Sequence, residues 1–234
     1  KTAVENKIDF LTLAPEVECG SFWEKTVQPL AVSSLALWFN TTELNLPDSK
    51  TVLGNGQFIL ARREAYENVG GSESVKDEVV EDVELAKRFK AAGFKVAFLN
   101  GTELYSTRMY TSLAQIVRGW TRIFIHLFEK NIARIAHKIL LFAFFSILPF
   151  AVLIAEAAFY CIGHPAFDPL TAAAALGVCL WIVIVRFAGN IMVRTNPWYA
   201  FAHLLGSLVM AWILGVCVAR IVLKRRSEWR GDRY

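Results

Sequence analysis

Three long apolar segments near residues 139–162, 170–189 and 199–223 constrain the fold more than any other feature of the sequence. At about 1.5 Å of rise per helical residue, each is about long enough to cross a bilayer. Residues 1–138 contain 17 Lys and Arg against 17 Asp and Glu, whereas residues 139–234 contain 8 against 4. The net charge of +4 therefore belongs to the apolar half. Basic residues that flank apolar segments indicate a membrane protein and argue against a nucleic-acid-binding one.

The basic residues also predict how the segments are oriented. A basic stretch precedes the first segment, and the loop GHPAFD that follows it has no Lys or Arg, so we expect the first segment to start in the cytoplasm. Three crossings would leave the tail KRRSEWRGDRY on the far side, although its charges favour the cytoplasm. Either one segment does not cross or the charge rule fails here. Glu156 and Arg186 are expected to reach opposite membrane surfaces and not to form an ion pair.

The first 110 residues have the alternating pattern of an α/β domain. Short apolar runs predict strands, and glycine-terminated patterns predict helices at 62–71 and 83–92. The predicted strands are 8–14, 57–61, 95–99 and 102–108. These strands are too few for a complete doubly wound sheet, so we expect the chain to be the later part of a longer polypeptide. The four cysteines form no CxxC pair, and therefore no zinc site or disulfide framework is predicted.

Residues 111–138 combine apolar side chains at helical spacing with basic side chains between them. This pattern predicts an amphipathic helix at the membrane interface, and an ordinary helix packed on a protein core is the alternative. The resulting organisation is an α/β domain at 1–110, the interfacial helix at 111–138, a transmembrane region at 139–223 and a basic tail at 224–234.

An acidic pair, Glu81 and Asp82, stands at the start of the predicted helix 83–92. A carboxylate in the first helical turn accepts backbone N–H bonds and meets the positive end of the helix dipole, so a cap is one interpretation. The spacing of Glu81 and Glu84 is close to that of a capping box. Seen alone, the pair is better explained as a cap than as a catalytic group.

Five motifs in a fixed order change this balance. They are GNGQFILARREAYENVGG, VVEDVELAKRFKAAG, LYSTRMY, QIVRGWTR with the three apolar segments after it, and a terminal WRGDRY. The order resembles the later half of membrane-bound family-2 glycosyltransferases, the group with the ceramide, carotenoid and hopanoid-type glycosyltransferases. The same order resembles, more distantly, that of the processive polysaccharide synthases. It implies a partial GT-A type domain that faces the cytoplasm and transfers a sugar from a nucleotide-sugar donor to a membrane lipid, with inversion.

The resemblance also assigns roles to particular residues. Asp82 would be the general base that takes the proton of the acceptor hydroxyl, and Glu81 would orient it or cap the helix. Gly54 and Gly56 match a glycine turn that lets the backbone approach sugar or acceptor closely, although a simple turn is an equal alternative. These residues are the predicted core of the site.

QIVRGW is similar to the Gln-x-x-Arg-Trp motif at the membrane edge of the active site in processive relatives, with Gly119 inserted. At about 100° per residue, the insertion turns Trp120 roughly 140° away from Gln115, which puts the family role of the tryptophan in question. Gln115 and Arg118 still share a helix face. Arg118 is a candidate for countering the diphosphate leaving group, and contact with lipid phosphates is the alternative.

The resemblance further implies Mg²⁺ or Mn²⁺, held by an Asp-x-Asp motif that these 234 residues do not contain. We therefore expect the donor-binding half to lie upstream and these residues alone to be inactive. Two alternatives stay open: a processive polysaccharide synthase, and a noncatalytic membrane scaffold that lacks the donor half.

Overall fold

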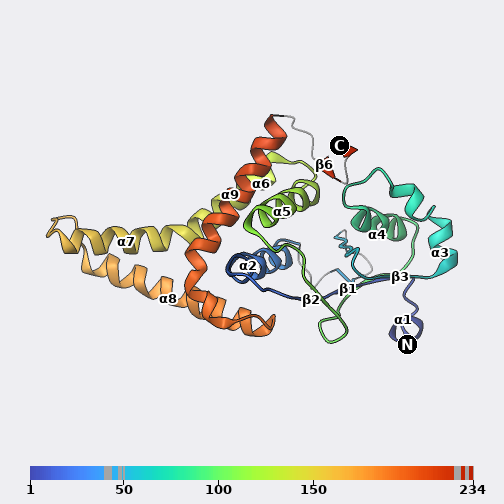
Figure 1. The fold of residues 1–234 in the computed structure, drawn as a ribbon, viewed down its shortest axis with the longest axis horizontal. Coiled ribbons are helices and arrows are strands. Elements are labelled where there is room, and N and C mark those ends of the chain that lie inside the picture. The colour runs from blue at the N-terminus through green and yellow to red at the C-terminus, as the bar shows by residue number, and fades with distance from the viewer. Residues whose placement is uncertain (40–43, 47–48, 50, 224–227, 230–231, 234) are drawn as a thin grey trace. The chain divides into compact units, whose positions relative to one another are not determined.

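The computed structural model describes residues 1–39, 44–46, 49, 51–223, 228–229 and 232–233. The chain forms two compact units, coloured by residue number in Figure 1. Unit 1 consists of Lys1–Glu16, Ser34–Thr107 and Glu228–Tyr234, and unit 2 of Val17–Ser33 and Arg108–Ser227.

A three-stranded sheet forms the centre of unit 1. The middle strand β1 (Phe10–Ala14) pairs antiparallel with β3 (Ile59–Ala61) and parallel with β4 (Val96–Asn100). In this register Leu11 lies opposite Leu60 on one side and Ala97 on the other. Three of the predicted strands are therefore confirmed, with β1 buried between its neighbours.

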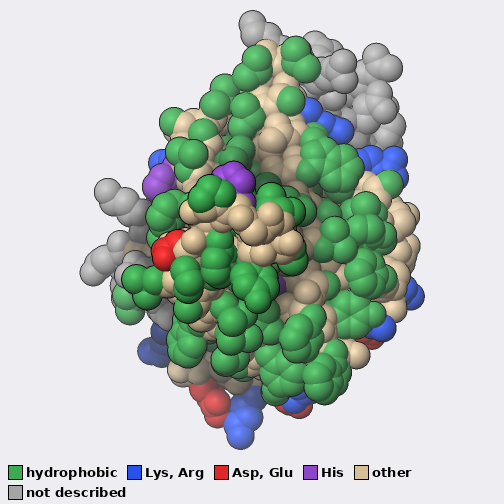
Figure 2. Space-filling model, turned by 90° about the vertical axis from the view of Figure 1, so that its left-hand side faces the viewer, with side chains coloured by type: hydrophobic (Ala, Val, Ile, Leu, Met, Phe, Trp, Pro, Cys, Tyr) green, Lys and Arg blue, Asp and Glu red, His purple; other side chains and the backbone are tan. Residues whose placement is uncertain are grey.

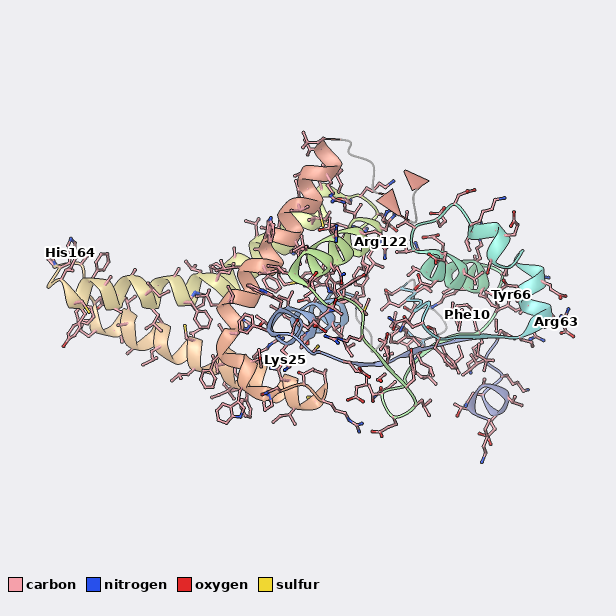
Figure 3. The ribbon with its side chains drawn as sticks, in the orientation of Figure 1. Phe10, Lys25, Arg63, Tyr66, Arg122 and His164 are labelled. Carbon is pink, nitrogen blue, oxygen red and sulfur yellow. The ribbon has the colours of Figure 1, made fainter. Side chains whose placement is uncertain are left out.

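Helices cover one face of this sheet. The helix α4 (Glu81–Ala91) packs there with α3 (Arg63–Asn68) and the 3₁₀ turn η1 (Ser72–Val75). Phe10 projects from β1 toward α4, where its ring lies 4.9 Å from that of Phe89, and Figure 3 labels Phe10 at this position. Leu11, Leu13 and Ala97 form a second cluster with partly buried neighbours that include Ile8 and Phe58. The two predicted helices of the α/β domain are confirmed.

The fourth predicted strand, at 102–108, is mostly a turn. Only β5 (Ser106–Thr107) is extended, because the amide of Leu104 donates to the carbonyl of Gly101 at 2.8 Å and closes a turn. The short elements α1 (Thr2–Glu5) and β2 (Glu16–Val17) complete this part of the chain. The mixed α/β class is confirmed, whereas the prediction of a strand over 102–104 is wrong.

Unit 2 contains two helices where one was predicted at 111–138. The helix α5 (Leu113–Leu127) ends before Glu129 and Lys130, both with positive φ, and α6 (Ile132–Phe142) follows. Ser112 caps α5 by accepting from the amide of Gln115. The apolar face of α5 is buried by protein, as the core-helix alternative expects. Its position at a membrane interface stays a prediction.

Three helices of unit 2 are long and apolar enough to cross a membrane: Ile132–Cys161, Pro169–Met192 and Pro197–Val222. The first combines α6, a π-helical turn η2 (Ala143–Ile147) and α7 (Leu148–Cys161). The second is α8 (Pro169–Met192), and the third combines η3 (Pro197–Ala202) with α9 (His203–Val222). The view in Figure 2 shows hydrophobic side chains over most of the face that carries these helices. These helices indicate an integral membrane protein.

Two further predictions concern the pair Glu156 and Arg186 and the tail of the chain. Glu156 and Arg186 are both buried and form no ion pair with each other in the structure described. Glu156 accepts from the amide of Asp168 at the start of α8, and Arg186 donates to the carbonyl of Thr26 at 3.2 Å, while their reach to opposite membrane surfaces stays a prediction. In the predicted tail at 224–234, residues 224–227, 230–231 and 234 lie outside the described residues, and β6 (Glu228–Trp229) pairs with β7 (Asp232–Arg233).

Candidate active site

The Asp82 carboxylate and the glycine turn at 54–56 lie against each other in unit 1. The amide of Gly56 donates to Oδ2 of Asp82 at 2.7 Å, and the amide of Val83 donates to Oδ1 at 2.9 Å. Both carboxylate oxygens are therefore fixed by backbone donors. A group held in one orientation in this way can receive a proton without first losing rotational freedom.

Packing against α4, and not the turn conformation alone, explains why residue 54 is a glycine. A Cβ atom built at Gly54 would lie within 3.0 Å of the carbonyl of Asp82 and the amide nitrogen of Val83. These are backbone atoms at the start of α4, so they cannot move aside as a flexible side chain would. The turn can rest on the helix start only with glycine at this position, and the close approach to sugar or acceptor expected from the sequence stays a prediction.

Asn55, between the two glycines, ties the turn to β1. Its amide donates to Oγ1 of Thr12 at 2.9 Å, and Oγ1 of Thr12 donates to the carbonyl of Asn55 at 3.1 Å. Its side-chain Nδ2 donates to the carbonyl of Leu13 at 2.8 Å. Because Thr12 is fully buried in the sheet, the turn has a rigid support. Sequence reasoning missed Asn55 and Thr12, and only the asparagine within Gly-Asn-Gly offered a signal.

Tyr105 joins the same edge of the sheet from the segment after β4. Its hydroxyl donates to the carbonyl of Leu13 at 2.9 Å, and its ring lies 5.9 Å from that of Phe58. The glycine turn and Tyr105 thus meet near the carboxyl end of β1, beside the parallel strand β4. In open α/β sheets, ligands bind outside the carboxyl ends of the strands.

The surroundings of Asp82 tune its acidity. Burial raises the pKa of Asp82, because a half-buried carboxylate loses hydration, while the hydrogen bonds from Gly56 and Val83 oppose the rise. The neighbouring charge of Glu81 adds to the increase. A carboxylate with a raised pKa is a stronger base than an exposed one, and this suits proton abstraction from a hydroxyl.

The structure does not support a capping role for Glu81. Helix α4 has Val80 at its N-cap, without a side-chain capping bond, and Glu81 is exposed. Glu84, the other member of the predicted capping box, accepts instead from Lys87 at 2.6 Å. The predicted capping box of Glu81 and Glu84 is therefore not found, whereas Asp82 accepts a backbone N–H bond from Val83 in the first turn, as the cap interpretation of the pair expects. Backbone amides hold Asp82, and the orienting role predicted for Glu81 has no bond to support it in the part of the chain described.

The predicted residues Gln115, Arg118 and Trp120 belong to unit 2, on α5. Gln115 is exposed, and its Oε1 accepts from the amide of Thr111 at 2.9 Å and from the hydroxyl of Thr111 at 3.1 Å. Together with the Ser112 cap, these bonds organise the start of the helix. Arg118 is exposed on the same helix. The Ser-x-x-Gln spacing was an available signal for a helix start.

Trp120 lies inside unit 2 and not on its surface. The indole is 3% exposed, its Nε1 donates to Oε1 of Gln28 at 2.7 Å, and its ring stacks 5.3 Å from Phe124. The inserted Gly119 has its own contact, because a Cβ there would overlap the ring of Tyr110. The insertion thus gives Trp120 a core position, in agreement with the rotation worked out from the sequence.

An ion pair that sequence reasoning missed organises the start of α2 (Phe22–Trp38) in unit 2. Glu24 is fully buried and accepts two bonds from Arg108, at 2.9 and 3.0 Å, plus the amides of Gly20 and Ser21. The bonds from Arg108 hold the pKa of Glu24 well below its ordinary range. The arrangement is a structural clamp between segments far apart in sequence, and the Ser21-x-x-Glu24 spacing was its signal.

Nothing in the described part of the chain groups three or more His, Cys, Asp or Glu residues where they would hold a metal ion. The described residues therefore do not form the metal site that the resemblance implies.

Comparison with known proteins adds one finding. A family model described as glycosyl transferase family 21 matches residues 48–234, which include the glycine turn, the acidic pair, α5 and the three apolar helices. No curated protein and no solved structure matches the chain.

Proposed function

This chain belongs to glycosyl transferase family 21, and we propose that it moves a sugar from a nucleotide-sugar donor to a hydroxyl group of a membrane lipid. The observation that carries the proposal is the Asp82 carboxylate, held by the amides of Gly56 and Val83 near the carboxyl end of β1. The site residues proposed with it are Gly54, Gly56 and Asp82. The domain that holds them is proposed to be GT-A type.

The proposed reaction is a displacement with inversion at the anomeric carbon. Asp82 accepts the proton of the acceptor hydroxyl, whose oxygen forms the new bond to the anomeric carbon while the bond to the nucleotide diphosphate breaks. The pair of electrons leaves with the diphosphate, and the proton remains on the carboxyl group. Burial of Asp82 favours this uptake because it favours the neutral carboxyl form.

A divalent Mg²⁺ or Mn²⁺, which we propose is held by an Asp-x-Asp motif outside these residues, would offset the charge of the leaving diphosphate. Arg118 is exposed on α5, and we propose its guanidinium group as a second group that offsets this charge.

A lipid acceptor is favoured over a growing polysaccharide by two observations. Three apolar helices place the enzyme in a membrane, where lipid hydroxyl groups are concentrated. Trp120, the tryptophan of the segment that resembles the processive motif, is buried against Gln28 and does not line a surface. A processive synthase would release a long polymer from labelled nucleotide sugar, whereas a lipid glycosyltransferase would release a glycolipid with one added sugar. The catalytic domain is proposed to face the cytoplasm.

The test of the base is a pair of substitutions in the complete membrane-bound protein. Asp82→Asn removes the proton acceptor but keeps the shape, and turnover should fall by about 10²- to 10⁴-fold while donor binding stays near normal. Glu81→Gln is the matched control, since Glu81 is exposed and makes no capping bond. Glu81→Gln should lose much less turnover than Asp82→Asn. Near-normal turnover in Asp82→Asn would refute the base assignment, and a noncatalytic scaffold would show no turnover in any form.

A further inference from the structure

The third apolar helix has different neighbours from the other two. α7 and α8 pack side by side as a hairpin, with His164 in the loop at its tip (Figure 3). In the third helix, η3 packs against α8, whereas α9 packs against α5 and against α6 and η2 of the first apolar helix, and α9 runs across the direction of the hairpin in Figure 1. The arrangement within unit 2 therefore differs from three spans that lie parallel to one another.

The start of α9 lies inside the membrane region but not at its far surface. The ring of His203 stacks 5.9 Å from Phe150, which stands near the middle of the first apolar helix. Three residues further on, Gly206 fits against the carbonyl of Thr26, the atom to which Arg186 also donates. Arg186 precedes the end of α8 by six residues, or about 9 Å. Both contacts put the start of α9 no deeper than the middle of the bilayer.

The other end of α9 lies against the amphipathic helix α5. The thiol of Cys217 donates to the carbonyl of Thr121 at 3.5 Å, so α9 stays beside α2 and α5 from Gly206 to Cys217, roughly 16 Å of helix. Exposed or half-buried basic residues, Arg118 and Arg122, lie on α5. If α9 crossed the bilayer, the stretch from Gly206 to Cys217 would lie in the hydrocarbon together with the parts of α2 and α5 beside it, where an exposed charge such as that of Arg118 is strongly disfavoured.

The free face of α9 is apolar along one stripe. Leu205, Leu208 and Trp212, spaced at i, i+3 and i+7, are 38%, 48% and 54% exposed. The basic residue Arg220 stands in the last turn of the helix, which ends at Val222, and the sequence continues with Lys224–Arg226. An apolar stripe that ends in basic residues fits the acyl chains and anionic headgroups of one leaflet.

We propose that α9 does not cross the membrane but slants through one leaflet, on the side from which the first apolar helix starts, with the stripe Leu205–Leu208–Trp212 against acyl chains. Only the first apolar helix and α8 then cross. The partner of this surface is the lipid of that leaflet. This topology returns the basic tail to the side from which the first helix starts, and it removes the conflict between three crossings and the tail charges.

Labelling of single cysteines tests the topology. In sealed vesicles of the complete protein with its native cysteines replaced, an impermeant maleimide reports the side of Asp77→Cys in the α/β domain, His164→Cys at the hairpin tip and Ser227→Cys in the tail. The expected result is that Ser227→Cys and Asp77→Cys react from one side and His164→Cys from the other. Reaction of Ser227→Cys from the side of His164→Cys would overturn the proposal.

Depth measurements give an independent result. Fluorophores placed at Leu205, Trp212 and Val222 are quenched by lipids that carry nitroxides near the bilayer centre, with Ile154 on α7 as a deep reference. We expect quenching to fall steadily from Leu205 to Val222. A maximum at Trp212, with weak quenching at both ends, is the signature of a crossing helix and would contradict the proposal even if a tail variant failed to fold.

Discussion

Gly54→Ala is the perturbation whose effect follows most directly from the geometry of the site. A Cβ at this position would fall within 3.0 Å of backbone atoms of Asp82 and Val83. Since these atoms belong to the first turn of α4, the glycine turn has to move away from the helix. The amide of Gly56, which donates to Asp82 at 2.7 Å, would move with it.

The size of the effect can be worked from two terms. Overpacking a tightly packed position costs about 1–3 kcal/mol of folding free energy. A hydrogen bond to a charged group contributes about 1.5–3 kcal/mol, and a tenfold change in rate corresponds to about 1.4 kcal/mol. We therefore expect unfolding to be easier by about 1–3 kcal/mol. Turnover should fall by about tenfold to a hundredfold where the orientation of Asp82 is lost.

The assay compares Gly54→Ala with Gly56→Ala in single-turnover kinetics and thermal unfolding in detergent. A Cβ at Gly56 would lie 3.4 Å from Oδ2 of Asp82, a contact that small shifts can accommodate, and the donating amide remains. This control should lose far less activity. Equal losses in the two variants, or an unchanged Gly54→Ala, would refute the argument that backbone contact with α4 positions the base.

Two further substitutions test the assignments in unit 2. Trp120→Phe removes the 2.7 Å bond to Gln28, and we expect a loss of about 1–3 kcal/mol in unfolding free energy with nearly normal turnover in the folded fraction; loss of turnover at unchanged stability would indicate a role at the substrate. Glu24→Gln leaves the half-exposed Arg108 without its ionic partner and should lower the midpoint of thermal or denaturant unfolding. Because the pKa of Glu24 is lowered in the folded protein, its ionised carboxylate stabilises the fold above the ordinary glutamate pKa, and this stabilisation is lost as the pH falls toward the pKa of the folded state. The stability of Glu24→Gln should therefore differ from that of the parent at neutral pH and converge with it in strong acid.

Local patterns in the sequence predicted the elements that depend on local contacts. The strands around β1 and the helices α3 and α4 were found because apolar runs and glycine stops mark them. The break between α5 and α6 was not, because Glu129 and Lys130 adopt positive φ without a glycine or proline to signal it. Periodicity also cannot tell whether an apolar helix face meets lipid or protein, and α5 meets protein.

The candidate site divides in the same way. Gly54, Gly56 and Asp82 are close in sequence to strong turn and helix signals, and the fold brings them together as predicted. The support from Thr12 depends on a contact across 43 residues, and the Glu24–Arg108 pair on one across 84 residues. No local pattern encodes such pairs. For Trp120, helix geometry alone predicted the rotation away from Gln115, and the burial of its side chain against Gln28 gives no support to its candidacy as a substrate-binding residue.

The central claim is that the Asp82 carboxylate takes the proton of the acceptor, and the pH dependence of kcat/KM tests it most directly. Because burial raises the pKa of Asp82, the parent enzyme should lose activity toward acid pH, about tenfold per unit, with a midpoint above that of an ordinary aspartate. The residual activity of Asp82→Asn should lack this acid limb. The same acid limb in Asp82→Asn would contradict the account, because another group would then carry the titration.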